Sequence, residues 1–456
     1  MQSMKREINE ITEGVIWKQL LAFFFPVLLG SLFQQLYNTV DTMIVGRFVG
    51  TEALAAVGGS SAQILNLIIG FFTGVSSGAT VIIAQFIGAR DEEDVSRSVH
   101  TAMILAAVCG GIMTVLGIAA APGLLHIMGT PADTMRDSVL YLRLVFLSMI
   151  PGMIYNMGSA ILRAAGDARH PLIFLILCCL VNVVLDLLLV CVFRMGVAGV
   201  AVATSLAQLI SAVLICAFLA RSRESYRLDR KLLRADGRML RRTVRIGLPT
   251  GLQSVLYAVS NMIITASVNS FGTDTVAAWV AMCKLDALTW LVMSAFSVAV
   301  MTFVGQNYGA KRIDRVKSSI RLCLAIAAGV TVLTGTLFVL GGRFFFFLFT
   351  DDLRIIGIAV KMLLCLAPWY WLYVPVEVLS GSLRGMGDTL VPTMITAVGI
   401  CFARVLWVFA LVPHWHTIQA VTLSYPVTWG LTSLAFTVYY LRFRKKRLSG
   451  YEPGQR

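Results

Sequence analysis

The chain has 456 residues, of which 57% are hydrophobic and only 14% are charged, and its mean hydropathy is +0.80. Soluble domains carry roughly 25% charged residues, so this composition excludes a soluble protein and indicates an integral membrane protein. The formal net charge is +14.

Twelve apolar runs follow one another along the chain, each close to or above the length of about 20 residues that a membrane-spanning helix needs. In lipid, backbone polar groups must be paired within the segment, so each run is predicted to be a helix. The runs are 18–45, 53–86, 98–120, 135–157, 170–192, 197–220, 244–270, 275–306, 318–340, 354–379, 390–412 and 418–441.

Lys and Arg residues are distributed very unevenly between the loops on the two sides of these runs. Of the 38 Lys and Arg residues, most lie in one set of loops, and cytoplasmic loops carry such an excess. We therefore expect a multi-pass protein of the plasma or inner membrane with both termini in the cytoplasm. The basic segment around 221–245 is interpreted as a topology signal and an interfacial segment on anionic lipid headgroups. Its single aromatic residue, Tyr226, makes no interleaved pattern of the kind that binds nucleic acid, and no nucleic-acid partner is expected.

Two motifs recur at a spacing of 221 residues. LRAAGDARHP (162–171) matches LRGMGDTLVP (383–392), and AQFIGAR (84–90) matches GQNYGAK (305–311). Six runs in each half mean that both halves enter the membrane from the same side. This predicts an all-α membrane protein with two six-helix lobes and a central cleft, the lobes being related by a pseudo-twofold axis along the membrane normal. The expected parts are an amino-terminal lobe (1–220), a connecting loop (221–243) and a carboxy-terminal lobe (244–456).

Sequence motifs of enzymes and ATP-driven pumps are missing from the chain. There is no GxxxxGK[ST] and no HExxH, and the nine cysteines form no CxxC and no Cys/His cluster with metal-ligand spacing. We therefore expect neither an enzyme nor a cofactor. Any transport must draw on an ion gradient or run downhill.

Polar side chains interrupt the first and fifth apolar runs. Gln34, Asn38 and Asp41 recur at helical spacing, so they share one helix face, and Asn182 and Asp186 do the same at i and i+4. An ionised carboxylate in lipid costs about 3 kcal/mol or more, so such residues have a specific role.

Thr204 in the sixth run lies at a depth similar to that of Asp41 and Asp186, counted at about 1.5 Å per residue. The set offers oxygen ligands for a cation such as Na⁺, and two carboxylates close together favour the uptake of a proton. The alternative is a structural polar network between packed helices.

These features resemble the multidrug and toxin extrusion (MATE) family, and its bacterial DinF-like branch in particular. The resemblance rests on the Pro-containing first run with Asp41, the GQxxGA-like ends, the LRxxGDxxxP element, and the pair Asn182 and Asp186. It implies a cation-coupled exporter with two six-helix lobes, in which Asp41, Asn182, Asp186 and Thr204 form the cation or proton site. The family often has Pro after the fifth-run Asp, whereas this chain has Leu187.

The carboxy-terminal half does not repeat the two carboxylates at the equivalent positions. Glu377 lies deeper than an interfacial residue, and functional and structural roles are equally open for it. Asp286 and Arg404 have matched depths, which predicts an ion pair with Lys284 as the alternative partner.

Met and aromatic side chains recur in runs that would line the cleft. Such adaptable surfaces suit varied amphipathic cations. The candidates for contact with substrate are Tyr37, Met157, Tyr257, Asn261 and Met282.

Together these features predict a secondary active antiporter that exports organic, cationic or amphipathic compounds in exchange for H⁺ or Na⁺. It would act as a monomer, with small organic substrates and membrane lipids as its partners. One alternative is a flippase for a lipid-linked precursor, which should have a strongly basic cavity. The other is a membrane scaffold or receptor, which would have no reason for depth-matched carboxylates.

Overall fold

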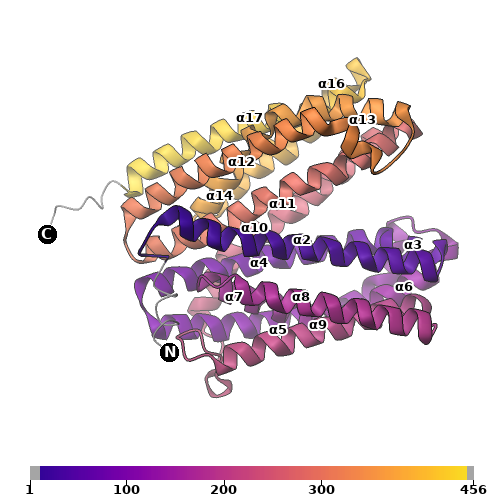
Figure 1. Cartoon of the computed structure of the whole chain (residues 1–456). Coiled ribbons are helices and arrows are strands. Elements are labelled where there is room, and N and C mark those ends of the chain that lie inside the picture. The colour runs from indigo at the N-terminus through magenta and orange to yellow at the C-terminus, as the bar shows by residue number, and fades with distance from the viewer. Residues whose placement is uncertain (1–10, 449–456) are drawn as a thin grey trace. The chain divides into compact units, whose positions relative to one another are not determined.

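The computed structural model describes residues 11–448, and every regular element in that range is a helix (Figure 1). Ten of these helical stretches are long and apolar enough to cross a membrane. An eleventh span is formed if α6 (Ala132–Leu147) and α7 (Met149–Ala164), which meet at a bend of 50°, are taken together. The twelfth predicted run, 418–441, is also helical, as α17 (Ile418–Phe443), although α17 does not have the hydropathy of the others.

Among the described residues, the chain forms two compact units, 25–251 and 11–24 together with 252–448. The divisions fall inside two long helices, α2 (Ile16–Phe48) and α10 (Gly237–Asn269). Each division lies beside a proline within the helix, Pro26 in α2 and Pro249 in α10. Proline removes one backbone hydrogen bond and crowds the preceding turn, so helices bend most readily at such positions.

The first unit is a bundle around one apolar core. It contains parts of α2 and α10 and the whole of α6 and α7. Its other elements are α3 (Thr51–Gly58), α4 (Ser60–Ala89), α5 (Glu92–Ile127), α8 (Arg169–Asp186), a π-helical turn (Leu187–Val192) and α9 (Gly196–Arg221).

Four glycines bring α4 and α10 together within this unit. Gly74 and Gly78 lie four residues apart on α4, as Gly247 and Gly251 do on α10, so each pair lies on one helix face. A Cβ atom added to Gly78 would lie 2.5 Å from the Thr243 carbonyl oxygen. Only glycine permits two backbones to approach this closely, so the glycines set the packing of α10 on the first unit.

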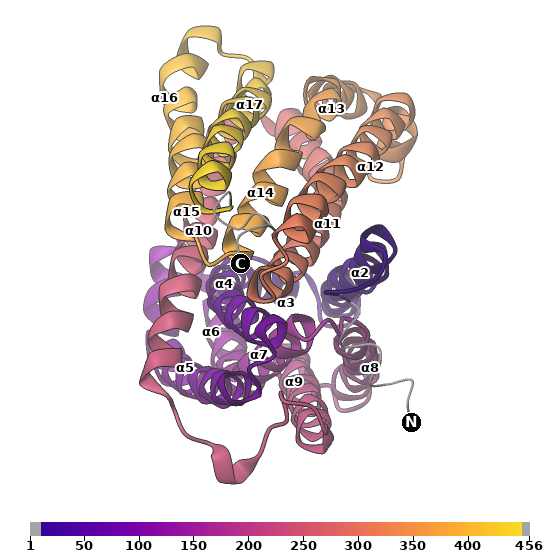
Figure 2. The ribbon, with the colours of Figure 1, turned by 90° about the vertical axis from the view of Figure 1, so that its left-hand side faces the viewer.

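The second unit is also a helical bundle (Figure 2). It contains parts of α2 and α10 and the whole of α17. Its other elements are α11 (Thr273–Gly309), α12 (Ile313–Phe347), α13 (Leu353–Leu366), a 3-10 segment (Ala367–Tyr373), α14 (Val374–Gly385), α15 (Leu390–Thr396), a π-helical turn (Ala397–Phe402) and α16 (Ala403–Trp415).

The start of α2 packs against α11 through aromatic rings. Phe24 stacks on Phe296 with 4.0 Å between ring centroids. Arg315 of α12 holds the residues that precede α2, donating hydrogen bonds to the carbonyl oxygens of Ile11 and Gly14 at 3.1 and 2.9 Å.

The two sequence repeats form the same backbone turns. Gly166 and Gly387 both have a left-handed conformation, with φ of 90° and 88°. Arg90 and Lys311, at the ends of α4 and α11, both have φ of 58°. The recurrence of these turns at a spacing of 221 residues shows that the repeat is one of local structure as well as of sequence.

Candidate coupling site

Three helices of the first unit bring the predicted polar set together. Asp41 lies on α2, Asn182 and Asp186 on the last turns of α8, and Thr204 on α9. Both carboxylates and Asn182 are buried, Asn182 and Asp186 completely. Their neighbours in these helices belong to one apolar cluster, which includes Val45, Val190 and Ala201. The site is therefore a small polar island within the core of the unit.

The side chain of Asn182 joins the two carboxylates. With its carboxamide nitrogen turned toward them, it donates hydrogen bonds to Asp41 Oδ1 at 2.7 Å and to Asp186 Oδ2 at 3.2 Å. In the same orientation its oxygen lies 3.3 Å from the backbone nitrogen of Thr204. Both carboxylates thus lie within hydrogen-bonding distance of one amide nitrogen.

The second oxygen of Asp186 is buried and unpaired. Within residues 11–448, Asp186 Oδ1 has no hydrogen-bond partner. Leaving a buried acceptor unsatisfied costs about 1–3 kcal/mol, and more if it is charged. The site therefore has unused capacity to bind a proton or a cation.

The helix widens immediately after Asp186. The π-helical turn Leu187–Val192 begins at the next residue, where the resemblance to the MATE family suggested a proline that this chain lacks. Single π turns are frequent at functional sites because they interrupt the regular hydrogen-bond ladder. The helix is irregular here although Leu187 replaces proline.

Tyr37 lies in this site, although the sequence analysis assigned it to the substrate cleft. It precedes Asp41 by one helical turn, and its hydroxyl donates to Thr204 Oγ1 at 3.4 Å. Asp41 and Thr204 therefore share an aromatic neighbour. The other two residues of the expected stripe, Gln34 and Asn38, are exposed and form no part of the buried set.

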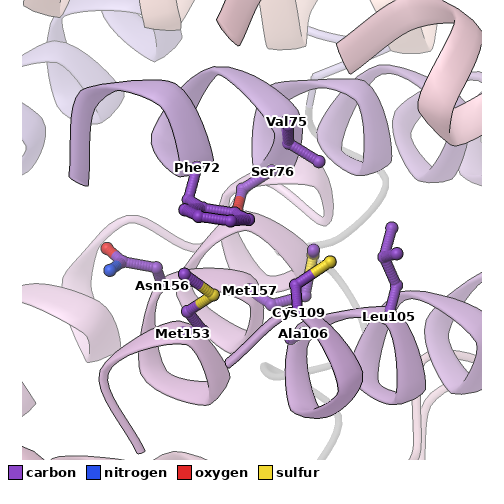
Figure 3. Close-up of a pocket in the computed structure, with 9 residues that line it drawn as sticks. All are labelled: Phe72, Val75, Ser76, Leu105, Ala106, Cys109, Met153, Asn156 and Met157. Atoms are coloured by element: carbon purple, nitrogen blue, oxygen red, sulfur yellow. The ribbon is translucent and has the colours of Figure 1, made fainter. Parts of the chain in front are cut away.

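Met157 is almost completely buried, and with Met153 it lines a small pocket between α4, α5 and α7 (Figure 3). The other lining residues are Phe72, Val75, Ser76, Leu105, Ala106, Cys109 and Asn156. The lining is mainly apolar, and Figure 3 shows Met153 and Phe72 facing each other across the pocket. Met157 thus forms part of a mainly apolar wall.

A further buried acid lies in the second unit. Asp286 of α11 accepts a hydrogen bond from Trp290 Nε1 at 2.7 Å. Arg404 of α16 is only 2% exposed, and its guanidinium carbon lies 3.9 Å from the centroid of the Tyr425 ring. The expected ion pair between Asp286 and Arg404 is not formed, and Lys284 does not replace Arg404; among residues 11–448, no salt bridge involves any of the three.

The physical reason is that Asp286 and Arg404 each interact with an aromatic side chain, Trp290 and Tyr425 respectively, instead of with each other. An indole N–H is a good donor to a carboxylate, and a guanidinium stacks well on a tyrosine ring. Asp286 Oδ1 and two Arg404 nitrogens remain without a hydrogen-bond partner among the described residues.

Glu377 of α14 accepts a hydrogen bond from the Tyr373 hydroxyl at 3.1 Å, and the Tyr373 and Tyr257 hydroxyls lie 2.8 Å apart. Tyr257, a predicted substrate contact, is therefore tied to Glu377 through one intervening tyrosine. Asn261 is exposed, and Met282 is almost completely buried.

One regularity links three carboxylates to aromatic residues that the sequence reasoning missed or assigned elsewhere. Tyr37 is four residues before Asp41, Tyr373 is four before Glu377, and Trp290 is four after Asp286. A spacing of four places two side chains on the same helix face. Aromatic residues at i±4 from Asp41, Asp286 and Glu377 were the signal that could have identified these aromatic partners, whereas Asp186 has no aromatic residue at that spacing.

The described part of the chain contains no group of three or more His, Cys, Asp or Glu side chains that could hold a metal ion. The set in the first unit is instead two carboxylates, one amide and one hydroxyl. Such a set suits an exchangeable monovalent ion better than a resident divalent metal.

A multi-helix membrane bundle with a buried, incompletely paired acidic site defines the class of ion-coupled secondary transporters. The MatE family model matches residues 26–188 and 249–409, and the chain belongs to this family of transporters. The predictions of an all-helical membrane fold and of a MATE transporter that is not an enzyme are thereby confirmed.

Two relatives and one solved structure extend this result. The chain is 27% identical over 444 residues to the "Probable multidrug resistance protein YoeA" of Bacillus subtilis, with 95% of each chain covered. It is 26% identical over 331 residues to a protein of Shewanella oneidensis named "FAD transporter", covering 70% of this chain and 71% of that one. The fold matches a MOP superfamily transporter from Pyrococcus furiosus with a TM-score of 0.89 at 22% identity, covering 98% and 99% of the two chains.

Proposed function

We propose that this protein is a secondary active antiporter that exports organic, cationic or amphipathic compounds in exchange for H⁺ or Na⁺. The coupling ion binds at Asp41, Asn182, Asp186 and Thr204. Family membership and the relative named as a multidrug resistance protein support the transport class. We further assign the chain to the DinF-like branch, acting as a monomer with both termini in the cytoplasm, on its motifs and on its distribution of basic residues.

The observation that carries the proposal is the bridge that Asn182 forms between Asp41 and Asp186. Two carboxylates held this close cannot both remain ionised without a compensating positive charge. A proton or a cation supplies that charge, and its departure makes the pair repel. Binding and release of the ion therefore change the forces between α2 and α8, as coupling requires.

The orientation of the Asn182 carboxamide distinguishes the two ions. With its nitrogen toward the carboxylates, the amide donates hydrogen bonds to them and offers no oxygen to a cation. This orientation suits the protonated or empty site. Turned over, its oxygen joins the carboxylate oxygens as a ligand for Na⁺. One rotation of one side chain thus converts the site between the two kinds of ion.

The experiment is export of a fluorescent organic cation from proteoliposomes, with the proton gradient and the sodium gradient imposed separately. We expect Asp41→Asn to abolish gradient-driven export and Asp186→Asn to weaken it and shift its pH or sodium dependence. Each substitution removes a charge while it preserves the side-chain volume, so the folded protein should persist in the membrane.

The matched control is Glu52→Gln on α3, which removes an exposed carboxylate of the same unit. This variant should export normally. Full gradient-driven export by the double variant Asp41→Asn, Asp186→Asn would show that the site does not couple, and Glu377 would become the leading candidate.

A further inference from the structure

The loop that joins α9 to α10 connects two candidate membrane spans. Helix α9 ends at Arg221 and α10 begins at Gly237, and both helices are candidate membrane spans. Residues 222–236 therefore lie on one side of the membrane, between the ends of two spans.

This loop is fixed to the first unit by buried anchors. His100 on α5 is 1% exposed, and its Nε2 accepts a hydrogen bond from the Asp229 backbone nitrogen at 3.0 Å. The backbone nitrogen of Asp236 donates to Thr101 Oγ1 at 3.0 Å. Tyr226 packs into the apolar core beneath the loop. The loop thus has a defined conformation with a defined outer face.

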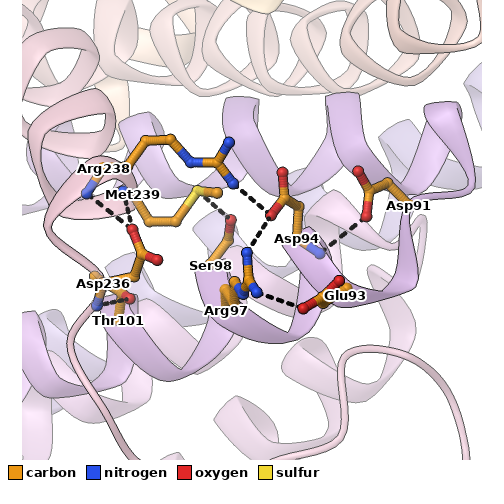
Figure 4. Close-up of polar contacts among 9 residues, drawn as sticks. All are labelled: Asp91, Glu93, Asp94, Arg97, Ser98, Thr101, Asp236, Arg238 and Met239. Atoms are coloured by element: carbon orange, nitrogen blue, oxygen red, sulfur yellow. Dashed lines mark hydrogen bonds and ion pairs between the residues drawn. The ribbon is translucent and has the colours of Figure 1, made fainter.

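A further set of contacts holds the end of the loop (Figure 4). Asp236 Oδ1 accepts from the backbone nitrogens of Arg238 and Met239 at 2.8 and 3.0 Å, so it caps the start of α10. Arg238 Nη2 donates to Asp94 Oδ1 of α5 at 2.7 Å. These contacts engage Asp236 and Asp94, the acidic groups at this end of the loop.

The outer face of the loop combines exposed leucines with exposed basic residues. Leu232 and Leu233 are 57% and 42% exposed. Arg230, Lys231 and Arg234 flank them and are exposed as well, and none of the three forms a salt bridge within residues 11–448. We call residues 230–234 the RKLLR face.

We propose that the RKLLR face binds anionic phospholipids of the cytoplasmic leaflet. Leu232 and Leu233 enter the boundary between headgroups and acyl chains, and the three basic side chains bind lipid phosphates. Guanidinium groups match phosphate oxygens geometrically, and the leucines gain from leaving water. The assignment to the cytoplasmic leaflet rests on the orientation proposed above. The contact between the RKLLR face and the lipids does not depend on transport activity.

Charge complementarity and position favour lipid over a soluble partner. The loop and the adjoining helix ends carry ten basic and three acidic residues over 221–245, so the field of this region attracts anions. Because the loop connects two spans, anionic headgroups are the anions that always lie within its reach. Two adjacent exposed leucines fit a lipid surface and would contribute nothing to recognition of a polyanion in water.

The test uses the full-length Leu232→Trp variant in nanodiscs made with brominated phospholipids, which quench tryptophan only at contact. The unsubstituted protein, with its eight native tryptophans, supplies the background to be subtracted. We expect the added emission to be quenched by brominated phosphatidylglycerol, much less by brominated phosphatidylcholine, and less in both at high salt because screening weakens the attraction.

Neutralising the basic residues should release the face. In the triple variant Arg230→Gln, Lys231→Gln, Arg234→Gln, binding of phosphatidylglycerol should weaken about fivefold for each side chain changed. The control variant Arg442→Gln, Arg444→Gln, Lys446→Gln removes the same charge from the end of the chain and should leave the quenching at residue 232 unchanged.

Two results would overturn the proposal. One is absence of quenching by brominated phosphatidylglycerol, which would place the face in water. The other is a change in the emission of the added tryptophan on addition of transfer RNA or polyglutamate with no lipid quenching, which would assign the face to a soluble polyanion. Because quenching is read without any ion gradient, neither result depends on whether the protein is an antiporter.

Discussion

Gly78 of α4 and Gly247 of α10 pack backbone against backbone in the first unit. A Cβ atom on either residue would collide with main-chain atoms of the other helix. We predict that Gly247→Ala lowers the free energy of unfolding by about 1–3 kcal/mol, because overpacking forces the two helices apart. Thermal unfolding in detergent measures this effect.

Gly111→Ala on α5 is the control for this prediction. A Cβ atom there would have no neighbour within 4 Å, and alanine is intrinsically better than glycine within a helix. Its stability should be unchanged or slightly higher. Equal stability of the two variants would show that α4 and α10 do not need their close approach.

Thr204→Val tests which ion the coupling site uses. Valine has nearly the same shape as threonine but lacks the hydroxyl that accepts from Tyr37. We expect export driven by a sodium gradient to need about fivefold more Na⁺, because one neutral ligand is lost, at a cost of about 1 kcal/mol. Export driven by a proton gradient should be nearly unaffected, because the carboxylates that bind the proton remain. A loss of both in parallel would mean that Thr204 acts by packing alone.

Trp290→Phe should destabilise the second unit. The substitution removes the indole nitrogen that donates to Asp286 Oδ2, and the other carboxylate oxygen has no partner among residues 11–448. A buried carboxylate without its donor should cost about 1–3 kcal/mol of unfolding free energy. In the double variant Asp286→Leu, Trp290→Phe the loss should be partly recovered, since no charge is then left buried. Thermal unfolding of the single and double variants provides the comparison.

Asp236 caps α10 in a pH-dependent manner. Hydrogen bonds from the backbone nitrogens of Met239 and Arg238 hold the pKa of the Asp236 carboxyl below its usual value. A lowered pKa in the folded state means that the cap stabilises the loop above the ordinary pKa of about 3.9, and that this contribution is lost as the pH falls. Asp236→Ala should therefore accelerate hydrogen exchange in residues 228–236 near neutral pH, and the difference from the parent should disappear at low pH. Equal exchange in the two proteins at neutral pH would contradict this role.

The sequence predicted that the residues of the candidate coupling site lie together, because polar residues in apolar runs are conspicuous. Polar residues such as Asn182 and Asp186 stand out in an apolar run, and the helical period puts them on one face. Depth along a helix can also be counted at a fixed rise per residue. Asp41 and Thr204 could therefore be placed at the level of Asp186 by counting residues from the ends of their apolar runs.

Direction around the helix axis could not be predicted in the same way. Asp286 and Arg404 have matched depths, yet each faces an aromatic side chain, Trp290 and Tyr425 respectively. Matched depth says how far along the helices two residues lie and nothing about which neighbouring helix each one faces. The exposure of Asn38 one turn from buried Asp41 has the same cause.

The boundaries of the two compact units could not be predicted from the sequence for a different reason. They fall within α2 and α10, where the helix continues through the division without a loop. Composition changes at loops, whereas packing partners can change in the middle of a helix. The pairing of small residues at Gly247 and Gly251 with Gly74 and Gly78 was a signal that would have indicated one of them.

The residues before α2 are held by Arg315, which lies 304 positions after Ile11 in the chain. During synthesis, the beginning of the protein therefore leaves the ribosome long before its partner has been made. The first unit, in turn, needs residues up to Gly251, so it cannot be completed when α9 emerges. While the following helices are inserted into the membrane, the residues before α2 must remain without their final contacts until α12 has been made. The order of synthesis therefore differs from the order of assembly.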